Sequence, residues 1–154
     1  MQAIKGKVLI VEDEVLVAVN YKDCLEGLGY SCQLAHKVQD AFHFIKNNDY
    51  LFVVCDHDLP DGNGLQLIQK TAEIKPDLKF IYMTAATSTV IRKAQDEKQI
   101  CTVLTKPVQE KTIIQTINNL KIAPNKNFKR FIGPAERKML LEIHKDGRKE
   151  KNNG

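Results

Sequence analysis

Four short polar segments of the chain carry residue types that could act together on a phosphate group. Each of them follows a run of apolar residues. The segments are Glu12-Asp13-Glu14, Asp56-His57-Asp58, Thr84-Ala85-Ala86 and Thr105-Lys106-Pro107. The first two are acidic, the third offers a hydroxyl and the fourth an ammonium group. Carboxylates bind divalent cations, and hydroxyl and ammonium groups donate hydrogen bonds to phosphate oxygens.

If the two acidic segments meet in the fold, their charges must be compensated. Two carboxylates about 4 Å apart repel each other by roughly 4 kcal/mol at an effective dielectric constant of about 20. A proton on one carboxyl group or a bound cation would relieve that repulsion. Carboxylates without Cys or His among the ligands suit Mg²⁺, which takes one or two carboxylates and several waters or phosphate oxygens. We therefore expect a magnesium and phosphate site in which Lys106 and Thr84 contact phosphoryl oxygens and Asp56 is a candidate nucleophile.

Apolar runs of strand length alternate with segments of helical spacing as far as residue 120. The runs predict strands buried on both faces, because they are continuous and do not alternate with polar residues. They are Val8–Val11, Ser31–Ala35, Leu51–Cys55, Phe80–Met83 and Cys101–Leu104. Apolar residues three and four apart predict five helices, within residues 17–28, 38–45, 64–73, 88–97 and 113–120.

This alternation predicts an α/β fold with a parallel sheet between two layers of helices, because parallel neighbours need crossover connections. Ligands of such sheets bind beyond the carboxyl ends of the strands. The four polar segments follow the first, third, fourth and fifth predicted strands. They should therefore meet at one edge of the sheet.

The polar segments and the strands before them resemble the receiver domain of two-component response regulators. The matching stretches occur in that family's order and at its usual separations, within residues 5–121. They are Val8-Leu9-Ile10-Val11-Glu12-Asp13-Glu14, Val53-Val54-Cys55-Asp56-His57-Asp58-Leu59-Pro60-Asp61-Gly62-Asn63-Gly64, Met83-Thr84-Ala85 and Thr105-Lys106-Pro107. The resemblance implies a flavodoxin-like, doubly wound sheet of five strands in the order 2-1-3-4-5 with five helices.

The resemblance also implies roles for individual residues. Asp56 would accept a phosphoryl group from a histidine kinase or phosphotransfer protein and later lose it, as a self-modifying phosphoacceptor that is not an enzyme. Mg²⁺ would be held by Glu12, Asp13, Asp56 and the backbone carbonyl of Asp58. Thr84, Ala85 and Lys106 would bind the phosphoryl group and act as the switch, and the peptide bond before Pro107 would be cis. An effector protein would bind the fourth helix and fifth strand, and the chain would be a monomer or a phosphorylation-dependent dimer.

Three positions bear on how far the resemblance extends. Similar receivers often have Tyr or Phe three residues before the lysine, where this chain has Val103. Aromatic coupling to the effector surface is therefore in question. Asp58 and Ala86 occupy positions that modulate phosphoryl lifetime in similar receivers, and we expect the Asp58 charge to alter metal affinity or to repel a phosphate donor.

Length and composition agree with one domain and a tail. The chain has 154 residues, of which 43% are hydrophobic and 27% charged, as in soluble globular proteins. We expect a receiver domain over residues 1–121 and a basic extension over 122–154, with one short helix and then a disordered stretch. The net charge of +4 comes from the end of the chain, because residues 121–154 hold 10 Lys and Arg against 4 Asp and Glu. No apolar run approaches the roughly 18 residues of a membrane span, and no secretory signal is evident, so we expect a cytoplasmic protein.

Two other functions compete with the receiver. The strand followed by Asp56-His57-Asp58 resembles the Asp-x-Asp motif of haloacid dehalogenase-type phosphatases, although the acidic pair here precedes that strand. The basic stretch Asn125–Ile132 contains aromatic residues and could bind nucleic acid. His57 itself is expected to be a solvent-exposed loop residue, and the four cysteines are expected to be small buried side chains with no metal or disulfide.

Overall fold

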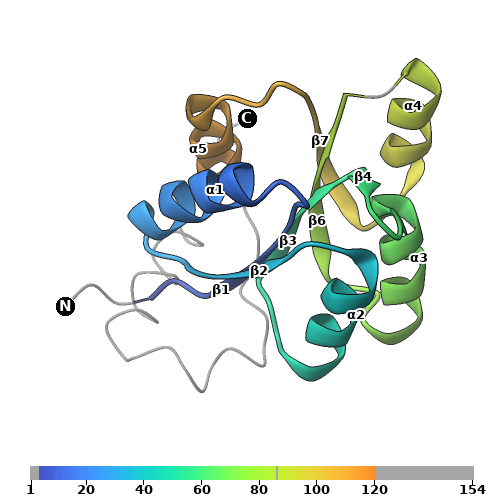
Figure 1. Cartoon of the computed structure of the whole chain (residues 1–154), viewed down its shortest axis with the longest axis horizontal. Coiled ribbons are helices and arrows are strands. Elements are labelled where there is room, and N and C mark those ends of the chain that lie inside the picture. The colour runs from blue at the N-terminus through green and yellow to red at the C-terminus, as the bar shows by residue number, and fades with distance from the viewer. Residues whose placement is uncertain (1–3, 86, 121–154) are drawn as a thin grey trace, which may run out of the picture.

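A computed structural model describes residues 4–85 and 87–120 of the chain. They form a five-stranded parallel sheet with helices on both faces (Figure 1). The sheet strands are β1 (Lys7–Val11), β2 (Ser31–Ala35), β3 (Phe52–Asp56), β6 (Lys79–Thr84) and β7 (Ile100–Thr105). Their order is β2-β1-β3-β6-β7. If only these five strands are numbered along the chain, the order is 2-1-3-4-5, as in the predicted flavodoxin-like fold.

Five helices cover the two faces of the sheet. They are α1 (Val15–Gly27), α2 (Val38–Asn47), α3 (Gly64–Ile74), α4 (Ser88–Asp96) and α5 (Glu110–Asn119). Figure 1 shows α1 and α5 together on one face and α2, α3 and α4 on the other. Each face has its own hydrophobic core: Val8, Ile10 and Met83 belong to the core under α1 and α5, and Leu9, Val11 and Tyr82 to the core of the opposite face.

Burial on both faces explains why the central strands are continuously apolar. All five residues of β3 are buried, and so are Val8–Val11 of β1. Successive side chains of a strand point to opposite faces, so a strand between two helical layers needs apolar residues at every position. The predicted strands are present, with small differences at their ends. Burial on both faces is confirmed for the central strands but was wrong for β2 and β7, which are mostly half-buried because they lie at the edges of the sheet. Asp56, expected just after its strand, is the last residue of β3.

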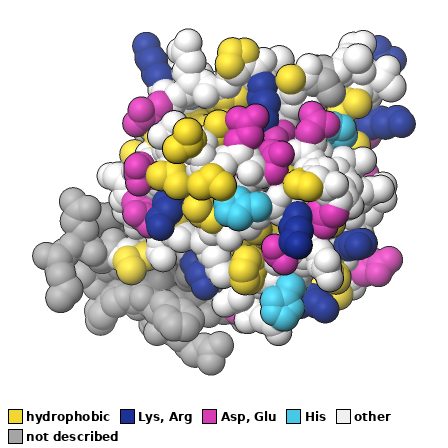
Figure 2. All heavy atoms as spheres, viewed as in Figure 1, with side chains coloured by type: hydrophobic (Ala, Val, Ile, Leu, Met, Phe, Trp, Pro, Cys, Tyr) yellow, Lys and Arg dark blue, Asp and Glu magenta, His cyan; other side chains and the backbone are white. Residues whose placement is uncertain are grey.

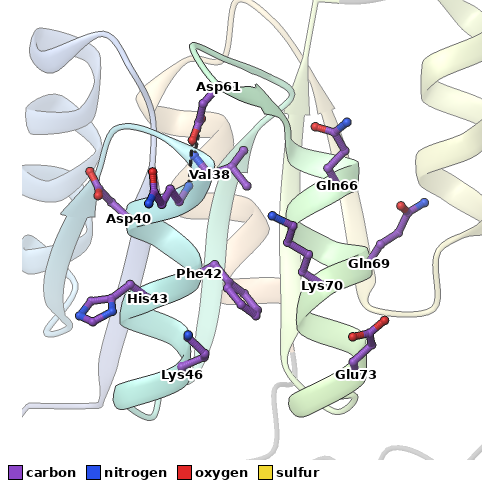
Figure 3. Close-up of a pocket in the computed structure, with 11 residues that line it drawn as sticks. Val38, Asp40, Phe42, His43, Lys46, Asp61, Gln66, Gln69, Lys70 and Glu73 are labelled. Carbon is purple, nitrogen blue, oxygen red and sulfur yellow. Dashed lines mark hydrogen bonds between the residues drawn. The ribbon is translucent and has the colours of Figure 1, made fainter.

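A small antiparallel hairpin between β3 and α3 was not predicted from the sequence. It consists of β4 (Asp58–Leu59) and β5 (Gly62–Asn63). Asp61 at its tip accepts hydrogen bonds from the backbone N–H groups of Val38 (2.7 Å) and Gln39 (3.0 Å), at the start of α2 (Figure 3). Asp61 thus caps a helix that is far away in the sequence. These backbone hydrogen bonds hold the pKa of Asp61 below its usual range, although its slight burial acts in the opposite direction.

Helix α3 begins with a capping box directly after the hairpin. The Asn63 side chain accepts from the Gln66 N–H at 3.0 Å, and the Gln66 side chain accepts from the Asn63 N–H at 3.0 Å. This reciprocal pair satisfies two N–H groups that the helix leaves unbonded. The following Gly64 is packed so closely that an added Cβ would lie 2.5 Å from Tyr82 and 2.8 Å from the Asp56 carbonyl oxygen. The start of α3 is therefore held against the end of β3.

Some predictions fall outside the described residues or need correction. The basic extension 122–154 and Ala86 lie outside them. Across residues 4–85 and 87–120 no helix combines the length and the apolar character that a membrane crossing needs.

The four cysteines are free, as expected, but only Cys24 and Cys55 are buried: Cys101 is exposed and Cys32 is half-buried. Both of these side chains lie in strands at the two edges of the sheet, where the helical layers cover less of the strand.

Candidate metal and phosphate site

The carboxyl ends of four sheet strands meet at one edge and bring the polar segments together. The register of the backbone pairing aligns these ends: Val11 is opposite Cys55, Asp56 is opposite Met83 and Thr84 is opposite Thr105. Consequently the residues at or just beyond the ends of β1, β3, β6 and β7 are neighbours in space. The predicted convergence of the four segments is confirmed.

Three acidic side chains form the centre of this edge. Glu12, Asp13 and Asp56 each offer a carboxylate oxygen, and these oxygens all lie within 4.8 Å of one another. Glu12 and Asp56 are buried, with 0% and 2% of their surface exposed, whereas Asp13 is exposed. Two buried carboxylates beside an open one form a site that a hydrated cation can reach from one side.

The orientation of Glu12 is set by its neighbours in the chain and by a histidine. Its Oε1 accepts a hydrogen bond from the Glu14 N–H at 3.3 Å, and its backbone carbonyl lies 2.8 Å from Nδ1 of His36. Its Oε2 is buried and has no hydrogen-bond partner among the described residues. A buried carboxylate oxygen that makes no hydrogen bond and lies beside two other acids fits a cation ligand.

Lys106 supplies the positive charge that the acids face. Its Nζ lies 2.7 Å from Asp56 Oδ2 and 3.5 Å from Glu12 Oε2. The Lys106 N–H also donates to the Thr84 carbonyl oxygen at 2.9 Å, and the peptide bond to Pro107 is cis, as expected from the resemblance. Residues at the ends of β6 and β7 are thereby fixed against each other on the rim of the acidic cluster.

The pKa values at this edge reflect burial and mutual repulsion. Burial, and next the charge of Asp56, raise the pKa of Glu12 from 4.5 to about 7, although Lys106 acts in the opposite direction. Burial by itself lowers the pKa of Lys106, but its hydrogen bond and ion pair with Asp56 outweigh this effect and raise the value. One lysine therefore does not fully neutralise the two buried acids.

The other predicted site residues border the cluster. Thr84 is fully buried at the end of β6, and Ala85 beyond it is exposed. The exposed Asp58 begins the hairpin, and its N–H lies 3.4 Å from Asp56 Oδ1. Its backbone is therefore adjacent to the phosphoacceptor candidate, as a carbonyl ligand at this position would require.

The expectation for His57 was wrong. Its side chain is half-buried, and Nδ1 is hydrogen-bonded to the hydroxyl of Tyr82, a fully buried residue of β6. The His57 N–H donates to the Met83 carbonyl oxygen at 2.8 Å, which extends the pairing of β3 with β6 by one residue and keeps His57 beside β6. Nothing in the local sequence marks Tyr82 as a partner of His57, since the two residues are 25 positions apart.

A separate groove lies between α2 and α3, away from the acidic cluster. It encloses about 1030 Å³, and its lining includes Phe42, Lys46 and Lys70 (Figure 3). None of the predicted site residues is among the residues that line it. The chemistry of the site therefore belongs to the sheet edge and not to this groove.

Comparison with known families agrees with the geometry of the sheet edge. A model described as the response regulator receiver domain matches residues 8–118. The chain belongs to this family. The match covers the five sheet strands except Lys7, the first residue of β1, and it includes all four polar segments. It favours the receiver over the phosphatase alternative.

Individual relatives are distant in sequence but close in structure. The receiver protein CpdR of Brucella abortus is 23% identical over 117 residues, which cover 76% of this chain and 98% of that protein. The sensor histidine kinase RcsC of Escherichia coli is 30% identical over 116 residues, which cover 71% of this chain but 12% of that protein. The HemR receiver domain of Leptospira biflexa superimposes with a TM-score of 0.70 at 26% identity, over 77% of this chain and 98% of that structure.

Proposed function

We propose that this receiver domain is a phosphoacceptor that takes a phosphoryl group on Asp56. The observation that carries the proposal is the buried Asp56 carboxylate, which contacts Lys106 at 2.7 Å and shares its site with Glu12 and Asp13. A carboxylate in this setting has an ammonium group at one oxygen and acidic ligands for a cation beside it. Such a site is suited to in-line phosphoryl transfer, which depends mainly on positioning and on charge neutralisation.

The donor set fits Mg²⁺. Glu12, Asp13, Asp56 and the backbone carbonyl of Asp58 would hold the ion. The buried Glu12 Oε2, which makes no hydrogen bond among the described residues, supports this assignment. When bound, Mg²⁺ would neutralise charge on the acids and on the phosphoryl oxygens. Only oxygen ligands are involved, which agrees with a hard cation.

In the transfer step an Asp56 oxygen attacks the phosphorus of a phosphohistidine. The P–O bond to Asp56 forms as the P–N bond breaks, and the departing imidazole keeps the electron pair of that bond and takes up a proton. Lys106 then moves its charge from the carboxylate to the new phosphoryl oxygens, and the Thr84 hydroxyl donates to another. Hydrolysis of the aspartyl phosphate returns the free carboxylate, so the chain is a self-modifying switch with no other substrate to turn over.

The donor protein would be a histidine kinase or phosphotransfer protein that docks beside the acids. Helix α1 begins next to Asp13 and exposes three apolar side chains there: Val15, Leu16 and Val19 are 58%, 80% and 37% exposed. Hydrophobic side chains gather beside acidic ones on the face shown in Figure 2. A partner helix could cover such a patch while it presents a phosphohistidine to Asp56.

The effector would bind the surface of α4 and β7. In α4 only Ala94 is buried, so most of the helix surface is open to a partner. We extend the receiver to residues 1–121 and assign residues 122–154 to a basic extension. We place the protein in the cytoplasm, as a monomer or a dimer that forms on phosphorylation.

Mass spectrometry after incubation with a small phosphodonor and Mg²⁺ tests the proposal. We expect one phosphoryl group on the wild type and none on Asp56→Asn. Asp58→Asn, which removes a neighbouring exposed acid, should still be labelled, with a changed phosphoryl lifetime if the Asp58 charge influences the site. A phosphoryl group at any residue other than Asp56 would refute the assignment.

A further inference from the structure

The Tyr82 hydroxyl lies at a buried junction of three segments next to the phosphoacceptor. It is hydrogen-bonded to Nδ1 of His57, the residue after Asp56, and the two rings meet edge to face with centroids 5.7 Å apart. Tyr82 itself is fully buried on β6, and its ring packs against Gly64 at the start of α3. Tyr82 therefore contacts the loop that carries Asp56 through its hydroxyl and α3 through its ring.

The hydrogen-bonding capacities of these groups define where the protons lie. Burial raises the pKa of the Tyr82 hydroxyl, so it keeps its single proton. With the hydroxyl as the donor, His57 Nδ1 is the acceptor, and this hydrogen bond fixes the position of the His57 ring.

Close backbone contacts transmit this restraint to Asp56. The His57 N–H donates to the Met83 carbonyl oxygen at 2.8 Å, and the His57 carbonyl oxygen accepts from the Gly64 N–H at 2.9 Å. Gly64 is at the same time in tight contact with the Tyr82 ring and the Asp56 carbonyl oxygen. The main chain directly after Asp56 is therefore held between β6 and the start of α3, beside the His57 ring.

Tyr82 also lies next to β7, in the core beneath α4. Tyr82 is paired in register with Val103 of β7, and both belong to the core that contains Ala94 of α4. Residues paired in register on neighbouring strands project to the same face, so the Tyr82 ring lies next to the Val103 side chain. The junction thus connects the phosphoacceptor loop with the layer beneath α4.

We propose that Tyr82 is a positioning residue for the phosphoacceptor: its hydroxyl holds His57, and through it the Asp56 backbone, in the geometry that phosphoryl transfer requires. This inference rests on the proposed function of Asp56. A nucleophile that is held in line reacts faster than one whose backbone is free to move, because orientation is established before the reaction. Without the hydroxyl, His57 Nδ1 loses this partner, and backbone hydrogen bonds remain to hold the loop.

Tyr82→Phe tests the proposal because it removes the hydroxyl and keeps the ring. Tyr50→Phe is a matched control, since Tyr50 is also buried and its hydroxyl is hydrogen-bonded to Gln33, away from the acidic site. We expect Tyr82→Phe to slow phosphorylation of Asp56 by a small donor at least threefold, and Tyr50→Phe to leave the rate unchanged. In ¹⁵N NMR spectra, the His57 ring should show the Nε2–H tautomer in the wild type and a mixture of tautomers in Tyr82→Phe.

His57 variants supply the second arm of the test. Asn can accept from the Tyr82 hydroxyl where Nδ1 does, so His57→Asn should retain most of the rate, whereas His57→Leu should be as slow as Tyr82→Phe. The double variant Tyr82→Phe/His57→Leu should be no slower than either single variant, because both remove the same hydrogen bond. Equal phosphorylation rates in the wild type and Tyr82→Phe, with normal labelling of Asp56, would overturn the positioning role alone. Absence of labelling in the wild type would instead overturn the proposed function.

Discussion

Replacing Glu12 with Gln tests whether unrelieved acidic charge destabilises the protein when no metal is bound. Gln has nearly the same shape as Glu but carries no charge. In the folded chain Glu12 is fully buried within 4.8 Å of other carboxylate oxygens. The Glu12→Gln variant should therefore be more stable than the wild type at a pH where Glu12 is ionised.

Two estimates of the stability difference between Glu12→Gln and the wild type give similar values. Folding raises the pKa of Glu12 from 4.5 to about 7, which corresponds to about 3 kcal/mol of free energy for a group that is ionised in both states. Separately, two unit charges 4.8 Å apart repel by roughly 3.5 kcal/mol at an effective dielectric constant of about 20. Lys106 offsets part of this repulsion. We expect the variant to be more stable by about 2 to 3 kcal/mol at pH 8.

The pH dependence follows from the sign of the shift. The folded state holds the Glu12 proton more tightly than the unfolded state, so between pH 4.5 and about 7 it binds more protons. The free energy of unfolding of the wild type therefore decreases as the pH rises through this window, relative to that of the variant. Near pH 4.5 the two proteins should have nearly equal stability, and the full difference should be present at pH 8.

Urea denaturation followed by circular dichroism, in EDTA at several pH values from 5 to 8, measures this difference. Glu14→Gln is the matched control, because Glu14 is a neighbouring acid with an exposed side chain; its stability should follow that of the wild type within about 0.5 kcal/mol. Added Mg²⁺ should stabilise the wild type at pH 8 more than Glu12→Gln, because the cation binds the folded acids. A difference between Glu12→Gln and the wild type that does not grow with pH would refute the reasoning.

Three further substitutions test other contacts of the structure. Lys106→Met leaves the buried acids without their ammonium partner. It should lower the free energy of unfolding in EDTA at pH 8 by about 1 to 3 kcal/mol. Mg²⁺ should restore part of that loss in a denaturant titration, and an unchanged free energy of unfolding would contradict the ion pair. Asp61→Ala removes the cap of α2 and should cost about 1 kcal/mol in the same assay, while Asp61→Asn should cost less. Gly64→Ala places a Cβ 2.5 Å from Tyr82 and should lower the free energy of unfolding by roughly 1 to 3 kcal/mol. Gly27→Ala lies in open space within α1 and should be neutral or slightly stabilising. Similar thermal midpoints for the two alanine variants would contradict the close packing of Gly64.

The architecture and the convergence of the candidate site residues could be predicted from the sequence. Continuous apolar runs such as Val8–Val11, alternating with segments of helical spacing, indicate strands covered on both faces, and crossover connections between parallel strands bring their carboxyl ends to one edge. Asp56, Thr84 and Lys106 each lie at such an end, and their convergence followed from topology alone. These features are local in the sequence or fixed by general rules of chain connection, which is why they could be predicted.

The contacts between residues that are far apart in the chain could be identified only from the folded structure. Three contacts depend on how neighbouring elements dock: the capping of α2 by Asp61, the hydrogen bond between Tyr82 and His57, and the close approach of Gly64 to Tyr82. No periodicity in the sequence specifies how closely two such elements pack. The same holds for the raised pKa of Glu12, because burial and the positions of nearby charges are properties of the packed molecule. The order of residue types along the chain brings the acids to one edge, and packing then determines how much charge that edge can hold.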